Sequence, residues 1–209
     1  MNINELPKII PIFPLSGALL LPKGNLPLNV FEPRYIGMID FAMKNEKMIG
    51  MIQEKKNSPK TKDLYSTGCL GRINQYSETN DGRYLINLSG IIRFHIVKEE
   101  KTSEKFRKIK VNYSKFKHDL TSNFENSFNR KIFLNEVRTY LAKNNIEVDW
   151  NIIRAANKTI LITTLASICP FSDAEKQMIL ECKNPNEIPK TMVSLFKMIG
   201  DNSASKNMN

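Results

Sequence analysis

The sequence predicts an α+β protein: an N-terminal half rich in antiparallel strands, followed by a helical half. Up to Tyr113, short apolar runs alternate with turn signals, and this fits about six strands and one helix in a small closed or nearly closed β-barrel. No strand-helix-strand alternation is present, so we expect no parallel sheet. Helical spacing takes over beyond residue 117. We predict a β-rich part over 1–120, a helical bundle over 121–200 and a disordered tail over 201–209.

Residues 12–40 hold three apolar runs that lead into one helix. The runs, each expected to be a strand, are residues 12–15, 19–21 and 26–31. Pro14 cannot donate a ladder hydrogen bond, so the first strand should lie at a sheet edge or leave the sheet there. Pro33 suits a first helical position, and Asn45 is a plausible end. The residues at helical spacing that should face the core are Tyr35, Met38, Ile39, Ala42 and Met43.

Four further strands and their turns complete the β-rich half. They are expected at residues 48–52, 65–77, 84–98 and 109–113. Gly68 and Gly71 indicate a bulge or a close backbone approach. Residues 78–82 have the composition of a hairpin turn. Gly90 should break the strand that surrounds it, and the charged residues 54–63 should form a mobile surface loop.

The helical half has clear start and stop signals. Its first helix should end at about Asn144. One apolar face of this helix is formed by Phe124, Phe128, Ile132, Val137, Tyr140 and Leu141. Asp149 can cap a second helix, in which Trp150 should anchor the core. Residues 159–169 are apolar nearly all round, as in a buried helix. Residues 172–175 form a capping box, and Gly200 should close the last helix.

Composition and charge limit the classes of function. The chain has 209 residues, 41% of them apolar, but no apolar run near the ~20 residues of a membrane helix. Its three cysteines are widely spaced, so we expect buried thiols in a cytoplasmic protein, with neither disulfides nor a zinc site. The net charge of +10 admits a nucleic-acid partner, although the basic residues are scattered. Together with the β-barrel expected in the N-terminal half, this charge makes RNA binding the alternative function.

Several segments together resemble one family. They are PIFPL, LPLNVFEPRY, IGMIQ, GRINQYSETNDGRYLINLSGIIRF and EKQMILE. Over residues 9–199 the chain resembles the N-terminal, substrate-binding domain of Lon proteases, most of all the small stand-alone proteins that carry only this domain. The resemblance implies a pseudobarrel of the type shared with PUA domains, followed by a helical bundle. It also implies a module that binds unfolded or exposed apolar polypeptide, with a separate protease or chaperone as a further candidate partner.

The residues themselves predict no catalysis. The segment nearest to a phosphate-binding loop runs from Gly17 to Lys23, but Pro22 occupies the place of its second glycine. His95 and His118 have no third group to orient them, and no metal-binding motif is present. We therefore expect no catalytic residue, no metal, no cofactor and no enzymatic activity; an unrecognised hydrolase is the least favoured alternative.

The candidate polypeptide-binding residues lie where the third apolar run meets the first helix. They are Leu28, Phe31, Glu32, Arg34 and Tyr35. The charged pair would form a polar rim on an apolar groove. Alternatively, Glu32 stabilises the helix N-terminus and Arg34 pairs with a nearby carboxylate. Arg72 and Arg93 lie on strands among apolar residues, where they should be buried and paired, or else line a cleft.

Overall fold

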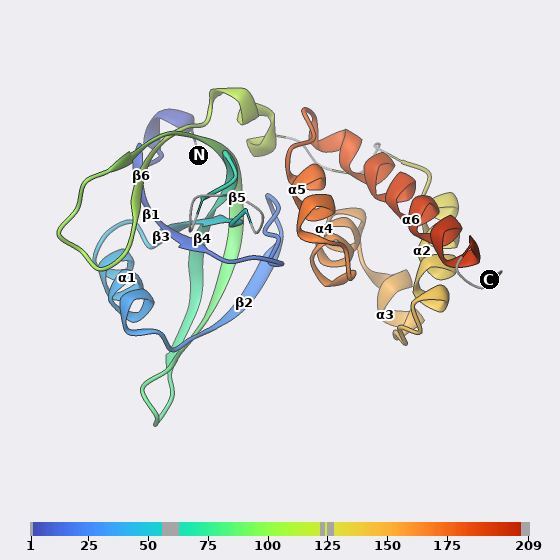
Figure 1. Cartoon of the computed structure of the whole chain (residues 1–209), viewed down its shortest axis with the longest axis horizontal. Coiled ribbons are helices and arrows are strands. Elements are labelled where there is room, and N and C mark those ends of the chain that lie inside the picture. Colours follow the sequence, from blue (N-terminus) through green and yellow to red (C-terminus); the bar gives the residue numbers. More distant parts are fainter. Residues whose placement is uncertain (1, 56–62, 122–123, 125–127, 206–209) are drawn as a thin grey trace.

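The computed structural model describes residues 2–55, 63–121, 124 and 128–205 (Figure 1). The strands are β1 (Ile9–Pro14), β2 (Asn25–Val30), β3 (Met48–Ile52), β4 (Thr67–Glu78), β5 (Tyr84–Glu100) and β6 (Lys108–Asn112). The helices are α1 (Pro33–Lys44), α2 (Arg130–Lys143), α3 (Trp150–Ala155), α4 (Lys158–Ile168), α5 (Asp173–Leu180) and α6 (Ile188–Ser205). Shorter 3-10 turns are η1 (Ile3–Glu5), η2 (Ser114–Leu120) and η3 (Pro185–Glu187). The predicted α+β fold is confirmed, and most of the predicted loop at 54–63 falls outside the described residues.

The six-stranded sheet closes on itself and leaves one strand outside the ring. Its order is β2-β5-β4-β3-β1-β6, and β5 also pairs with β6. The 17 residues of β5 make this possible, because the first part of the strand pairs with β2 and β4 and the last part with β6. Among the described strands, β2 pairs with β5 alone, so it forms an edge beside the barrel. In Figure 1 the helices α2–α6 form a separate bundle, with α4 and α5 toward the barrel.

One strand pair corrects the expectation of purely antiparallel pairing. β1 runs parallel to β3, with Ile12 opposite Gly50. The connection between them contains β2 and α1, which gives the long crossover that parallel strands require. The next element after β1 is β2, which pairs with β5 and not with β1. The strand-helix-strand order that is typical of parallel pairs is therefore not evident in the sequence. Pro14 is the last residue of β1, so the strand does leave the sheet there.

The leucine run at residues 19–21 is buried but is not a strand, contrary to the prediction. Its backbone crosses β5 at Gly90, where a Cβ atom would collide with the carbonyl of Leu21. The amide of Lys23 donates to the Gly90 carbonyl at 2.8 Å, and the Gly90 amide donates to the Gly24 carbonyl at 2.8 Å. The prediction that Gly90 breaks its strand is therefore wrong: β5 continues through Gly90, and the glycine permits a close backbone approach.

The other signals of the β-rich half are confirmed. Pro33 is the first residue of α1, and Asn45 is its C-cap. Tyr35, Met38, Ile39 and Ala42 are buried, and Met43 is half-buried. At Gly68 a Cβ atom would clash with the ring of Phe94, and the register between β4 and β5 shifts at Gly71. Gly82 has a φ of 77° in the hairpin turn.

In the helical half, the first helix begins later than predicted and the last helix ends later. The first bundle helix, α2, starts at Arg130, and Ile132 is 58% exposed while its neighbour Phe133 is buried. Phe124 and Phe128 precede the helix, and helical spacing counted from them selects Ile132 in place of Phe133, whereas Val137, Tyr140 and Leu141 are buried as predicted. The caps at Asp149 and Ser172 are confirmed. The last helix, α6, continues through Gly200 to Ser205, because a glycine without positive φ need not end a helix.

Buried polar contacts join the barrel to the bundle. Arg93 on β5 is fully buried and makes an ion pair of 2.7 Å with Asp119 on η2. The same guanidinium donates to the carbonyls of Leu180 and Cys182 at the end of α5. Arg93 is thus buried and paired as predicted, whereas Arg72 is exposed. Within the described part of the chain, none of the helices combines the length and the apolar composition that crossing a bilayer requires.

Candidate functional site

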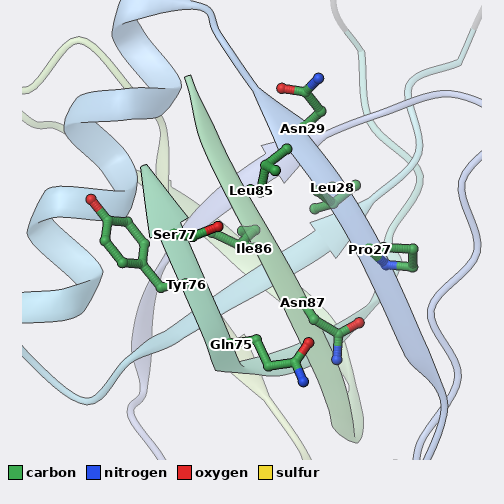
Figure 2. Close-up of a pocket in the computed structure, with 9 residues that line it drawn as sticks. All are labelled: Pro27, Leu28, Asn29, Gln75, Tyr76, Ser77, Leu85, Ile86 and Asn87. Carbon is green, nitrogen blue, oxygen red and sulfur yellow. The ribbon is translucent and has the colours of Figure 1, made fainter. Parts of the chain in front are cut away.

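A shallow hollow of about 640 Å³ lies on the part of the sheet that β2, β5 and β4 form (Figure 2). The residues that line it are Pro27, Leu28, Asn29, Gln75, Tyr76, Ser77, Leu85, Ile86 and Asn87. None of these nine side chains is charged. They combine apolar surface with amide groups, each of which can donate and accept hydrogen bonds.

The strand register brings the polar and apolar residues into rows across the three strands. Asn29 lies opposite Leu85, and Leu85 lies opposite Ser77. In the next outward-facing row, Asn87 sits between Pro27 and Gln75. A backbone crossing these rows would therefore meet an apolar side chain and an amide within one strand spacing of each other.

Asn87 lies on β5, the middle of the three strands that form the hollow. Its side-chain amide nitrogen donates to Asn74 Oδ1 at 2.8 Å and to Asn25 Oδ1 at 3.3 Å, which fixes the orientation of the amide group. Because the two N–H groups are engaged, the Asn87 carbonyl oxygen is the atom of this amide best able to accept a further hydrogen bond.

Two large apolar side chains provide exposed surface at the hollow. Leu85 is 42% exposed and Tyr76 is 40% exposed. Tyr76 lies on the side toward α1 and packs edge-to-face on Tyr84, with ring centroids 5.0 Å apart (Figure 2). The Tyr84 hydroxyl donates to Asp40 Oδ1 at 3.0 Å. Hydrogen bonding with Tyr76 and with Asp40 raises the pKa of Tyr84. The bond to Asp40 links the aromatic pair to α1.

The predicted site residues are brought together only in part. Leu28 is half-buried and lines the hollow. Phe31 follows the end of β2 and is 66% exposed. Arg34 Nε donates to Glu32 Oε2 at 2.9 Å, and the Arg34 guanidinium lies 4.4 Å from the centre of the Tyr35 ring. Tyr35 is itself buried, with its ring edge-on to a phenylalanine of β1.

The alternative interpretation of the charged pair is therefore correct in one respect. Arg34 does pair with a nearby carboxylate, and that carboxylate belongs to Glu32. The Glu32 side chain makes no capping hydrogen bond to α1. Both side chains keep more than a third of their surface exposed, so the pair is a surface feature beside the end of β2.

The family model described as "ATP-dependent protease La (LON) substrate-binding domain" matches residues 9–193. The chain belongs to the LON substrate-binding domain family. A Lon protease of Buchnera aphidicola subsp. Acyrthosiphon pisum is 28% identical over 194 residues, which are 90% of this chain and 25% of that protein. Lon protease 2 of Myxococcus xanthus is 29% identical over 100 residues, which are 46% of this chain and 12% of that protein. The chain thus spans about a quarter or less of the length of these relatives.

Solved structures show the same fold. The Lon N-terminal domain protein from Xanthomonas campestris has a TM-score of 0.61 at 17% identity and covers 90% of this chain and 98% of its own. The N-terminal domain of the Mycobacterium avium complex Lon protease also has a TM-score of 0.61, at 16% identity, and covers 91% and 98% of the two chains.

Sequence reasoning missed the part of this LON domain where the hollow lies. Tyr76, Leu85 and Asn87 were not among the predicted site residues. A signal was present, because Leu85 alternates with the inward-facing Ile86 and so places a large apolar side chain on the outer face of β5. An outward leucine among polar residues is common on protein surfaces, and only the three-strand register shows that it lies between an amide, Asn29, and a hydroxyl, Ser77.

The groups that carry chemistry elsewhere in this LON domain are dispersed. His95 and His118 are exposed, and the three cysteines are free and buried. Among the residues that the structure describes, no three His, Cys, Asp or Glu side chains are grouped so that they could hold a metal ion.

Proposed function

We propose that this chain is a non-catalytic module that binds unfolded or exposed apolar polypeptide across the outer face of β2, β5 and β4. The observation that carries the proposal is the hollow with nine uncharged lining residues. Its amides can hydrogen-bond to the backbone of an extended chain, and its apolar side chains can desolvate the side chains of the guest. The chain has a net charge of +10, yet the residues that line the hollow carry no charge, so the hollow is suited to an uncharged ligand.

The predicted site residues form one end of the proposed binding face. Phe31 would contact apolar side chains of the guest, and Leu28, which lies opposite the inward-facing Ile86, would support the face from the core side. Glu32 and Arg34 would meet its backbone or polar groups, and Tyr35 would act indirectly by supporting the Arg34 guanidinium from the core. This assignment leaves Tyr35 out of direct contact with the guest because its ring is buried.

The comparisons support polypeptide over RNA as the ligand. The matched family is described as a substrate-binding domain, and the relatives are Lon proteases. RNA and DNA are held largely by Arg and Lys side chains on their phosphates, and the hollow offers neither. Delivery of the bound polypeptide to a separate protease or chaperone is part of the proposal.

The test measures binding of a fluorescently labelled protein that has been reduced and carboxymethylated so that it cannot refold. The variants are Phe31→Ser and Leu85→Ser, both at exposed positions where folding should be unaffected. We expect each to weaken binding by about 1–2 kcal/mol, or roughly 5- to 30-fold in Kd. Val97→Ser is the matched control, because Val97 is 55% exposed on β5 but lies outside the hollow.

Equal affinity of the wild type and both variants would place the binding surface elsewhere on the chain. A wild type that does not bind the unfolded probe, but binds RNA selectively at physiological salt, would refute the proposal and favour the alternative. Nonspecific RNA binding should instead weaken steeply as salt rises.

A further inference from the structure

The bundle carries an apolar groove between α3 and α4, and the residues of the hollow contribute nothing to it. Its volume is about 300 Å³, and its walls include Ile152 and Ile153 from α3 and Leu161 and Leu165 from α4. Eight of its ten lining residues are aliphatic, and none is aromatic or basic.

The groove exposes isoleucines that a folded chain would ordinarily cover. Ile152 is 69% exposed, Ile160 is 51% exposed and Ile168 is 59% exposed. The sequence predicted that residues 159–169 would be buried on all sides, and α4 does bury Leu161 and Leu165. Ile160, Thr164 and Ile168 instead follow one another at intervals of four residues, so they form a stripe about 12 Å long on the open side of α4.

The lining contains a single ionisable group, and that group is already engaged. Asp149 caps α3, where its carboxylate accepts a hydrogen bond of 2.8 Å from the Asn151 amide. Polar recognition in the groove is thus limited to Thr164 and to the remaining capacity of Asp149. The occupant must therefore be held by aliphatic contact.

The size of the groove argues against a second copy of this chain as the occupant. A stable protein–protein interface uses about 20–30 residues on each side, and ten residues line this groove. The exposed surface of Ile152, Ile160 and Ile168 added together is less than that of two fully exposed isoleucines. An area of this size matches a short segment that inserts a few side chains.

We propose that the groove between α3 and α4 binds a short segment rich in Val, Leu or Ile within the same unfolded polypeptide that the hollow binds. This inference rests on the proposed function and narrows its substrate class. The hollow offers amides with scattered apolar groups, whereas the groove offers aliphatic surface alone. Preferred substrates therefore contain an aliphatic run as well as a neutral polar run.

The first experiment places a reporter in the groove. Thr164 is exposed in the groove, and the native Cys69, Cys169 and Cys182 are buried, so a Thr164→Cys variant can be labelled selectively with an environment-sensitive fluorophore. The probes are an unstructured peptide rich in Leu and Val and the same peptide with Ser and Asn in their place. We expect a blue shift with the aliphatic peptide only, and none with the label at Thr139→Cys, an exposed threonine on α2.

The second experiment removes the stripe without weakening the helix. Ile160→Asp places a negative charge in the first turn of α4, and Ile168→Lys places a positive charge in its last turn, both favourable to the helix dipole. The double variant should bind the aliphatic peptide at least about tenfold more weakly. Ile132→Asp is the matched control: Ile132 is the third residue of α2, as Ile160 is of α4, and is 58% exposed.

Each outcome bears on a different claim. Unchanged binding of the aliphatic peptide to the folded double variant would overturn the groove assignment and leave the proposed function standing. An equal loss in Ile132→Asp would overturn it as well, because the effect would not be local. A dimer that dissociates in the double variant would show that a second copy is the occupant. A wild type that binds neither peptide nor the unfolded protein would refute the proposed function together with this inference.

Discussion

Asp119→Ala tests the buried ion pair that holds Arg93, the residue whose guanidinium joins the barrel to the bundle. The Asp119 carboxylate accepts hydrogen bonds from the Arg93 amide at 2.9 Å, from Nε at 2.9 Å and from Nη2 at 2.7 Å, and both side chains are fully buried. Truncation would leave the guanidinium with only the two carbonyls at the end of α5. Breaking a buried pair in this way costs about 3–5 kcal/mol, a large part of the ~5–15 kcal/mol that stabilises a typical domain.

The assay is urea unfolding followed by two signals. Trp150 is the only tryptophan of the chain and reports on the bundle, while far-UV circular dichroism reports on both halves. With a slope of ~2 kcal/mol per M urea, the midpoint should fall by roughly 1.5–2.5 M. An apolar pair, Arg93→Met with Asp119→Leu, should recover much of the loss because no charge remains buried. An Asp119→Ala midpoint within 0.5 M (about 1 kcal/mol) of the wild type would refute the reasoning.

Two further predictions follow from burial. Trp150 is half-buried at the edge of the core, with the Arg138 guanidinium 4.9 Å from its ring, so it is not the core anchor that the sequence predicted. Trp150→Ala should lower the free energy of unfolding in urea by only ~1–2 kcal/mol. Phe133→Ala, at a buried position, should lower it by ~3–5 kcal/mol. Burial raises the pKa of Cys169 to about 12, so its stabilising contribution is present below the unfolded pKa of ~8.5 and is lost as pH rises above it. Stability should therefore fall less between pH 8.5 and 10.5 in Cys169→Ala than in the wild type, and identical pH profiles would contradict this.

Features that depend on neighbouring residues could be predicted from the sequence. Pro33 starts α1 because its fixed φ and missing amide suit a first helical position. Ser172 and Glu175 form a capping box because each reaches the backbone of the other across one turn. These signals need only three or four residues of context, and their positions were correct.

Features that depend on distant partners could not be predicted in this way. The leucines at 19–21 have strand composition, yet their backbone lies against β5 because Gly90, about 70 residues later, leaves room for it. Burial of Arg93 could be inferred, but its partner Asp119 lies 26 residues away on a 3-10 turn. The candidate site has the same character, since the hollow exists only where β2, β5 and β4 align.

The buried contacts between the halves also bear on how the two proposed binding surfaces would act together. Gln53 of the β-rich half donates to Gln177 Oε1 at 3.1 Å, and Lys176 of α5 donates to the Gly17 carbonyl at 2.6 Å. Together with the bonds from Arg93 to the carbonyls at the end of α5, these bonds fix the sheet against the bundle. A polypeptide bound in the hollow would therefore present its next segment to the groove at a high effective concentration, provided that its linker spans the distance. Two weak contacts could then retain an unfolded chain that neither would hold alone, and a compact folded protein could not reach both.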